Sequence, residues 1–207
     1  MSAKRRRWHE HLAVSTSPRI PPLPRDEWTD AARDVFAFWE GPRARNAGSR
    51  SPPMMMLARH PALALASLEF GRYVLVQSLL SERQRELVVL RVAWRYRSHY
   101  QWAHHVDSAR RLGLTEDELA ALRSAERSPI WSRHERALLA AIDQLCDQGR
   151  IDDPTWDLLA EEMDRRQLMD FIYAIGFYAM NAWAFGAMRV QLEPGFGGDP
   201  MSALEPA

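Results

Sequence analysis

Apolar residues recur at helical spacing through almost the whole of this 207-residue chain, and this pattern restricts its fold more than any other feature. No stretch alternates convincingly between apolar and polar residues as a β-strand would. Ser81, Thr115 and Asp153 stand where helix N-caps are expected, and Gly113 and Gly149 stand where helix C-termini need a left-handed residue. The sequence therefore predicts an all-α protein built as one compact, multi-helix domain.

The predicted helices number about eight or nine and are joined by short turns. They cover residues 27–40, 53–60, 61–78, 82–96, 99–112, 116–124, 132–148, 154–164 and 167–190. Residues 41–52, rich in Gly, Ser, Arg and Pro, form the longest predicted internal loop. We expect a basic, flexible arm at residues 1–18, the helical domain at residues 19–195, and a tail at residues 196–207.

The overall charge of the chain is balanced, with 27 Lys and Arg residues against 27 Asp and Glu residues. There is thus no general attraction to nucleic acid or to an anionic membrane, and we expect a small-molecule partner. Cys146 is the single cysteine and has no partner for an internal disulfide. The basic residues 4–7 are not followed by the apolar run of a signal peptide. These features predict a cytoplasmic protein.

Residues 171–188 are apolar and about as long as the shortest membrane-spanning helix. Asn181 lies in the middle of this segment, Gly176 and Gly186 flank that position, and Asp170 directly precedes the segment. These residues suit a helix buried between other helices or subunits better than a helix in lipid. We therefore predict a buried helix and no membrane contact.

A carboxylate and a histidine on consecutive predicted helices indicate chemistry. Glu86 shares its helix face with apolar residues, so it needs a polar partner. On the next helix, His105 stacks over Gln101, whereas His104 points about 100° away, so only one of the two histidines can easily face Glu86. A carboxylate that orients an imidazole is a device for general acid–base catalysis, and it makes an enzyme the leading hypothesis.

These residues belong to a longer ordered motif. In sequence order it comprises Arg85, Glu86, Leu87, Ser98, Gln101, His105, Ala109 and Gly113. Here the chain resembles the carboxymuconolactone decarboxylase and alkylhydroperoxidase superfamily, whose cores read Arg-Glu-Leu, an apolar helix, a Cys-x-x-Cys pair, a histidine four residues beyond it, then Ala and Gly. Residues 19–28, 59–63, 132–138 and 176–181 also look like the lyase-like branch. The resemblance implies an alkylhydroperoxidase-like helical fold and an obligate homo-oligomer, a trimer or hexamer.

Both cysteine positions of the motif are lost, because Ser98 and Gln101 occupy them. A thiol peroxidase needs one thiolate to attack peroxide and a second thiol to resolve the product. Cys146 does not replace them, because it shares a helix with apolar residues and is predicted to lie in the core. An alkylhydroperoxidase-like antioxidant enzyme is therefore a disfavoured alternative. Ser98 and Gln101 also fit the pattern of a helix capping box.

The decarboxylase branch implies a cofactor-independent lyase or isomerase, most simply a decarboxylase-like lyase, acting on a small carboxylated or lactone substrate. In that reading His105 is the general acid–base, Glu86 fixes its tautomer, and Arg91 or Arg95 holds a substrate carboxylate. The predicted substrate-binding residues are Arg95, Tyr96, Ser98, His99, Gln101, Trp102, Tyr178 and Asn181. No metal is predicted, since His99 and His104 are five residues apart and do not share a helix face.

Several alternatives stay open at this point. His105 can be a structural partner of Glu86 without turnover, and the chain can be a catalytically silent, ligand-binding oligomer. Decarboxylation, isomerisation, lactone hydrolysis and elimination of water all suit a Glu–His pair, and the sequence does not choose among them.

Overall fold

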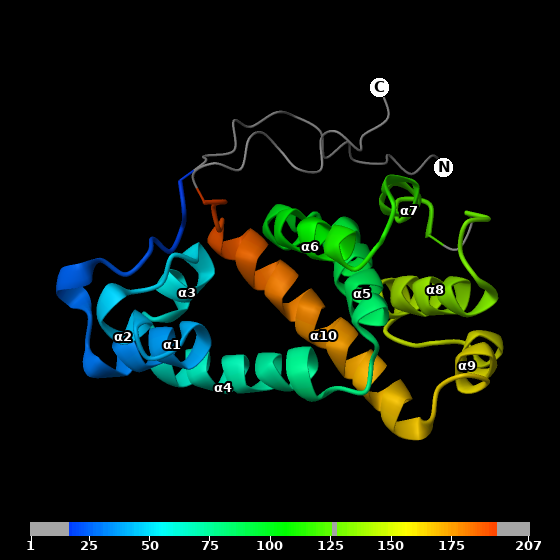
Figure 1. Cartoon of the computed structure of the whole chain (residues 1–207), viewed down its shortest axis with the longest axis horizontal. Coiled ribbons are helices and arrows are strands. Elements are labelled where there is room, and N and C mark those ends of the chain that lie inside the picture. The colour runs from blue at the N-terminus through cyan, green and yellow to red at the C-terminus, as the bar shows by residue number, and fades with distance from the viewer. Residues whose placement is uncertain (1–16, 126–127, 194–207) are drawn as a thin grey trace, which may run out of the picture.

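The computed structural model describes residues 17–125 and 128–193 (Figure 1). The predicted tail at residues 196–207, and all but the last two residues of the predicted arm at residues 1–18, lie outside the described residues. Within the described residues the chain forms ten α-helices and no strand, which confirms the predicted all-α fold.

The helices follow one another with short connections. They are α1 (Asp30–Glu40), α2 (Ala44–Ala47), α3 (Pro52–Leu57), α4 (Pro61–Arg72), α5 (Glu82–Arg95), α6 (His99–Arg111), α7 (Glu116–Ala121), α8 (Arg133–Gln148), α9 (Asp153–Ala160) and α10 (Arg165–Met188). Two other helical segments are a 3-10 turn, η1 (Arg25–Glu27), and a π-helical segment, η2 (Tyr73–Gln77). Six of the α-helices fall within predicted ranges, α3, α9 and α10 begin one or two residues before theirs, and α2 was missed inside the predicted loop at residues 41–52.

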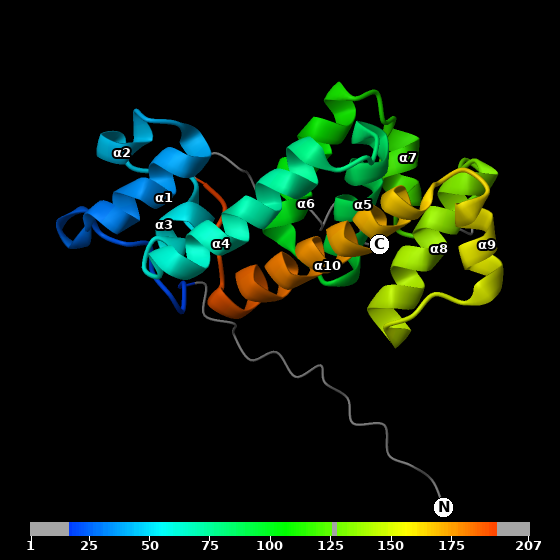
Figure 2. The same cartoon turned by 90° about the horizontal axis from the view of Figure 1, so that it is seen from below.

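The long helix α10 runs diagonally through the middle of the molecule (Figure 1). Helices α1 to α4 lie at one end, α7 to α9 lie at the other, and α5 and α6 lie beside α10 in both views (Figures 1 and 2). One apolar core joins α5, α6, α8 and α10, and a separate, smaller core joins α1, α3 and α4. A cavity lies between these two cores.

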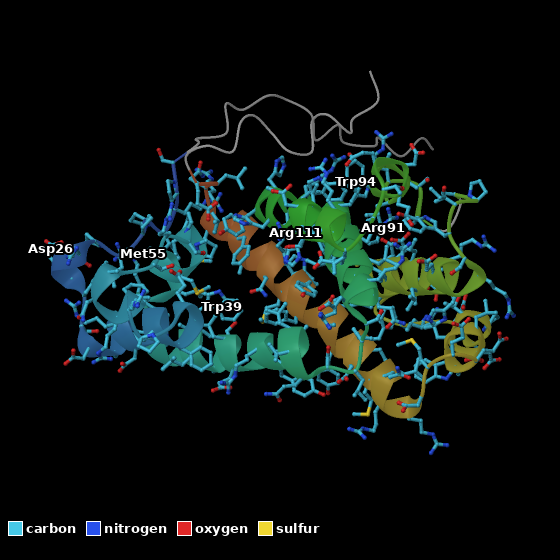
Figure 3. The ribbon with its side chains drawn as sticks, viewed as in Figure 1. Asp26, Trp39, Met55, Arg91, Trp94 and Arg111 are labelled. Carbon is cyan, nitrogen blue, oxygen red and sulfur yellow. The ribbon has the colours of Figure 1, made fainter. Side chains whose placement is uncertain are left out.

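Helix α5 is the centre of the larger core, because its residues from Leu87 to Ala93 are all buried. The one charged residue in that stretch, Arg91, is 4% exposed. Its Nε donates to one oxygen of Asp143 at 2.8 Å, its Nη2 donates to the other at 2.6 Å, and its Nη1 donates to the Arg123 carbonyl at 3.1 Å. This bidentate pair joins Arg91 of α5 (labelled in Figure 3) to α8, and the prediction that Arg91 binds substrate is wrong.

Capping explains most of the helix boundaries. Ser81 and Thr115 both form capping boxes, as predicted for these N-caps. Gly113 and Gly149 have positive φ angles of 88° and 68°, as predicted. The predicted N-cap at Asp153 is wrong by one residue: its neighbour at position 152 accepts the capping hydrogen bond, and α9 starts at Asp153.

Helix α4 ends earlier than predicted because the chain widens into the π-helical segment η2 before Ser78. This turn brings the Tyr73 hydroxyl to Asp170 Oδ1 at 2.6 Å and the Leu79 backbone N–H to Asp170 Oδ2 at 2.7 Å. The hydrogen bond to Asp170 raises the pKa of Tyr73, so this tyrosine stays a donor. The buried carboxylate of Asp170, which lies within α10, therefore joins η2 to this helix.

Helix α10 is buried along one face only. Its length and composition would allow it to cross a membrane, and 39% of the apolar window lies inside the protein. Phe171, Ala174 and Tyr178 are among its buried residues, whereas Tyr173 and Trp183 are 60% and 57% exposed. The predicted burial between helices thus holds for one face, and the other face is open in the single chain.

Candidate active site

A cavity of about 730 Å³ lies between α6 and α10 on one side and α3, α4 and the end of α1 on the other. Its lining combines an apolar wall with a group of polar side chains. The lining residues are Trp39 (Figure 3), Glu40, Arg50, Ser51, Pro53, Met54, Leu57, Ser67, Leu68, Gly71, Leu75, Tyr100, Gln101, His104, His105, Phe177, Tyr178, Asn181, Phe185 and Glu193. Such a volume suits a small organic molecule.

The structure brings Glu86 and His105 together beside this cavity. Glu86 Oε2 lies 3.0 Å from His105 Nδ1, and the two side chains are 12% and 23% exposed. Because a carboxylate only accepts hydrogen bonds, Nδ1 is the protonated nitrogen of a neutral His105, and Nε2 carries the lone pair. Glu86 stands behind the histidine, since His105 lines the cavity and Glu86 does not.

Tyr178 is the aromatic neighbour of His105 in the cavity wall. The two ring centroids are 5.8 Å apart, with the rings nearly perpendicular at 82°. Burial raises the pKa of Tyr178, and the negative charge of Glu86 raises it further. Tyr178 therefore keeps its proton and acts as a neutral hydrogen-bond donor beside the histidine.

A second histidine faces the same cavity. His104 Nε2 lies 2.9 Å from Glu193 Oε2, and the Tyr100 hydroxyl donates to Glu193 Oε1 at 2.8 Å. The Ser51 hydroxyl lies 3.2 Å from that of Tyr100 and must be the donor of their hydrogen bond, since the tyrosine proton goes to Glu193. Sequence reasoning missed Ser51, Tyr100 and Glu193; the one signal that could have been used is the spacing of Tyr100 and His104, four residues apart on one helix.

Ser98 and Gln101, which stand at the lost cysteine positions, do not form the capping box that their spacing suggested. Ser98 makes no side-chain capping hydrogen bond, and Gln101 Nε2 instead donates to the Tyr178 carbonyl at 3.1 Å. Both residues are buried, and Ser98 Oγ and Gln101 Oε1 have no hydrogen-bond partner within the described part of the chain. Gln101 therefore links α6 to α10 in the cavity wall, and Ser98 lies behind the lining.

Arg95 and Tyr96 do not reach the cavity, which corrects two of the predicted substrate contacts. The Arg95 guanidinium pairs with Asp147 and lies 3.7 Å from Asp143, both on α8. The Tyr96 hydroxyl donates to the Cys146 carbonyl at 3.5 Å, and burial raises the pKa of Tyr96 to about 12. Arg95 faces α8 because it lies four residues after Arg91 on the same helix face, and Tyr96 reaches α8 from the C-cap of α5.

Trp102 and His99 also lie away from the cavity. Trp102 is 2% exposed and packs in the larger core against Trp94, with ring centroids 5.8 Å apart. His99 is exposed at the start of α6. Of the predicted site residues, Gln101, His105, Tyr178 and Asn181 line the cavity, Glu86 supports it, and the remaining five lie elsewhere.

The one cysteine of the chain does not reach the cavity. Cys146 packs against the larger core from α8, does not line the cavity, and has its pKa raised by burial. A buried thiol with a raised pKa is a poor nucleophile. Among the described residues, no group of three or more His, Cys, Asp and Glu side chains is placed to hold a metal ion.

The fold and the histidine–carboxylate pair beside the cavity define an alkylhydroperoxidase-like helical protein with a candidate acid–base site. Residues 61–144, which run from α4 into α8 and include Glu86 and His105, match the carboxymuconolactone decarboxylase family. This match and the solved structures that share the fold support the likeness to the carboxymuconolactone decarboxylase/AhpD-like superfamily that the sequence motif implied. None of the curated proteins matches the sequence.

Solved structures share the fold at low sequence identity. The alkylhydroperoxidase AhpD core of an uncharacterised peroxidase-related protein from Ralstonia eutropha JMP134 has a TM-score of 0.71 at 15% identity, covering 86% of this chain and 94% of its own. A peroxidase-related protein from Silicibacter sp. TM1040 has a TM-score of 0.70 at 16% identity, with coverages of 90% and 99%. A variant of the debrominase Bmp8 in complex with 2,3,4-tribromopyrrole has a TM-score of 0.69 at 17% identity, with coverages of 90% and 97%. At these identities the likeness concerns the fold alone.

Proposed function

We propose that this protein is a cofactor-independent lyase or isomerase that moves protons on a small lactone or related carbonyl compound, with His105 as the general acid–base. The observation that carries the proposal is the 3.0 Å contact of His105 Nδ1 with Glu86 Oε2 at the wall of the 730 Å³ cavity. The proposal leaves out the predicted contact of Arg95 with a substrate carboxylate, because Arg95 pairs with Asp147 of α8.

The chemistry follows from the tautomer that Glu86 selects. With the proton on Nδ1, Nε2 of His105 takes a proton from a carbon next to a carbonyl and returns it elsewhere on the substrate. Glu86 stabilises the imidazolium that forms between the two steps. The neutral Tyr178 hydroxyl and the Asn181 amide are the cavity groups that can donate to the developing enolate oxygen. A positioned acid–base of this kind contributes about 10²–10⁴-fold to the rate.

The alternative of an alkylhydroperoxidase-like redox enzyme shares the fold and lacks the thiols. Ser98 and Gln101 hold the two cysteine positions, and Cys146 is remote from the cavity. A catalytically silent, ligand-binding oligomer is the other alternative. The experiment that follows contains an arm for each of them.

The test is ligand-dependent thermal stabilisation by lactones, muconate-like diacids, hydroxy acids and peroxides, on wild type and on His105→Ala. We expect one carbonyl class to stabilise the wild type and not the variant; a ligand at 100 times its Kd adds about 2.7 kcal/mol. His134→Ala, on α8 outside the cavity, is the control and keeps the response. Peroxide consumption that thiol alkylation abolishes would support the redox alternative, and stabilisation that survives in His105→Ala would support the silent binder.

We also propose that the protein is a homo-oligomer, a trimer or hexamer, that covers the open face of α10. The exposed residues Met169, Tyr173, Gly176, Met180 and Trp183 follow one another at alternating spacings of four and three, which places them in a single stripe. We expect sedimentation equilibrium to give three or six copies for the wild type and a smaller assembly for Tyr173→Lys. Leu63→Lys, at an equally exposed residue on α4, is the control; a monomeric wild type would contradict the proposal.

A further inference from the structure

We propose that His104 and Glu193 form a second proton-transfer pair in the same cavity, so that the reaction there is a two-base proton shift on an uncharged lactone. The inference rests on the proposed function of His105 and adds a catalytic residue and a substrate class to it. It is carried by the geometry of two histidines that share one cavity and have separate carboxylates.

The second pair also joins a histidine to a carboxylate, but through Nε2 of His104 where the first pair uses Nδ1 of His105. His104 Nε2 lies 2.9 Å from Glu193 Oε2, as His105 Nδ1 lies 3.0 Å from Glu86 Oε2. Glu193 follows α10, whereas Glu86 lies on α5, so the two carboxylates come from different elements. The histidines are consecutive on α6 and point about 100° apart, which lets them reach a bound molecule from different directions.

His104 is not needed to anchor the chain that follows α10. The Tyr100 hydroxyl already donates to Glu193 at 2.8 Å, and its ring packs 4.4 Å from the His104 ring. Burial raises the pKa of Tyr100, and the hydrogen bond to Glu193 raises it further, so Tyr100 is a fixed donor. His104 adds an imidazole to this group and, at 36% exposure, can exchange a proton with water.

The charges of the cavity favour an uncharged substrate. Glu40 and Glu193 both line it, and Glu86 lies directly behind His105. Arg50 is the one arginine or lysine among the described lining residues. A substrate carboxylate would meet more negative than positive charge there. A lactone instead offers an acidic C–H and an uncharged carbonyl, and it fits an apolar wall of leucine, methionine and phenylalanine side chains.

The proposed step balances without an oxidant. His105 Nε2 takes the proton from the carbon next to the lactone carbonyl, and the C–H electron pair moves into a dienolate. The His104 imidazolium then delivers its proton to the far end of the dienolate, which forms the conjugated isomer. His105 ends protonated and His104 neutral, and proton exchange with water restores both. One C–H bond breaks, one forms, and a double bond moves.

The probe is α-angelica lactone in D2O, followed by NMR for deuterium at the carbon next to the carbonyl and for the conjugated isomer, each above the buffer rate. We expect wild type to do both, His105→Gln to lose both, and His104→Gln to keep the exchange while isomer formation falls about 100-fold. Glu193→Gln shifts the ratio of isomerisation to exchange in the same direction. That ratio does not depend on how much of a variant is folded, and His134→Gln leaves it unchanged.

The possible outcomes separate the two proposals. If His104→Gln leaves the ratio at its wild-type value, the second pair takes no part and the inference is overturned, while His105 keeps its role. If the wild type exchanges no hydrogen of the lactone, the proposed function fails and the inference fails with it. If a carboxylated analogue of the lactone turns over faster than the lactone, the substrate class is wrong.

Discussion

Replacement of Asp143 with alanine is expected to lower the free energy of unfolding by about 3–5 kcal/mol, because it leaves a buried charge without its partner. Arg91 is 4% exposed, and Asp143 accepts hydrogen bonds from its Nε at 2.8 Å and its Nη2 at 2.6 Å. Without this carboxylate, the guanidinium keeps only backbone carbonyls of residues 122 and 123 as acceptors. Urea unfolding followed by circular dichroism measures the loss.

A nearby ion pair provides the matched control for this change. Asp147 lies one helical turn beyond Asp143 on α8 and pairs with Arg95, but it is 54% exposed. Asp147→Ala should therefore cost less than about 1 kcal/mol. The double change Arg91→Met with Asp143→Leu removes both charges and should cost less than Asp143→Ala alone. Equal losses for Asp143→Ala and Asp147→Ala would show that burial does not set the strength of these pairs.

The helices could be predicted because their signals are local. A capping box such as that at Ser81 or Thr115 involves residues three apart, and a C-terminal glycine such as Gly149 needs only its own backbone conformation. Helix α2 was missed because its four residues lie among Gly, Pro and Ser, where no apolar period can show. The end of α4 was placed too late because the π-helical turn depends on Asp170, which lies about 90 positions away in the sequence.

The sequence identified those site residues that belong to the motif or share one helix face. Glu86 and His105 were found together because Glu86 lies on an apolar helix face and both residues belong to the ordered motif. Glu193 could not be found, since it follows α10 in an irregular segment and meets His104 only through the tertiary fold. Arg95 was misassigned because helical spacing shows that it shares a face with Arg91 but does not show that α8 supplies acidic partners for both.

Glu86→Gln is expected to slow turnover of α-angelica lactone by about 10²–10⁴-fold while the protein stays folded. Glutamine keeps the size of Glu86, but its amide can donate to Nδ1 as well as accept from it. It can thus hold the His105 tautomer whose Nε2 is protonated and cannot act as a base. It also removes the negative charge that stabilises the imidazolium. Steady-state kinetics, with thermal unfolding in parallel, measures both effects.

Glu82→Gln separates this effect from a general loss of charge on α5. Glu82 lies one turn before Glu86 on the same helix, is exposed, and does not line the cavity, so its variant should turn over at the wild-type rate. If the hydrogen bond from His105 Nδ1 to Glu86 only holds α5 against α6, its loss lowers stability. The rate per folded molecule then stays unchanged. A rate loss without a matching loss of stability therefore assigns Glu86 to the orientation of His105, and the reverse result returns the pair to the packing of α5 against α6.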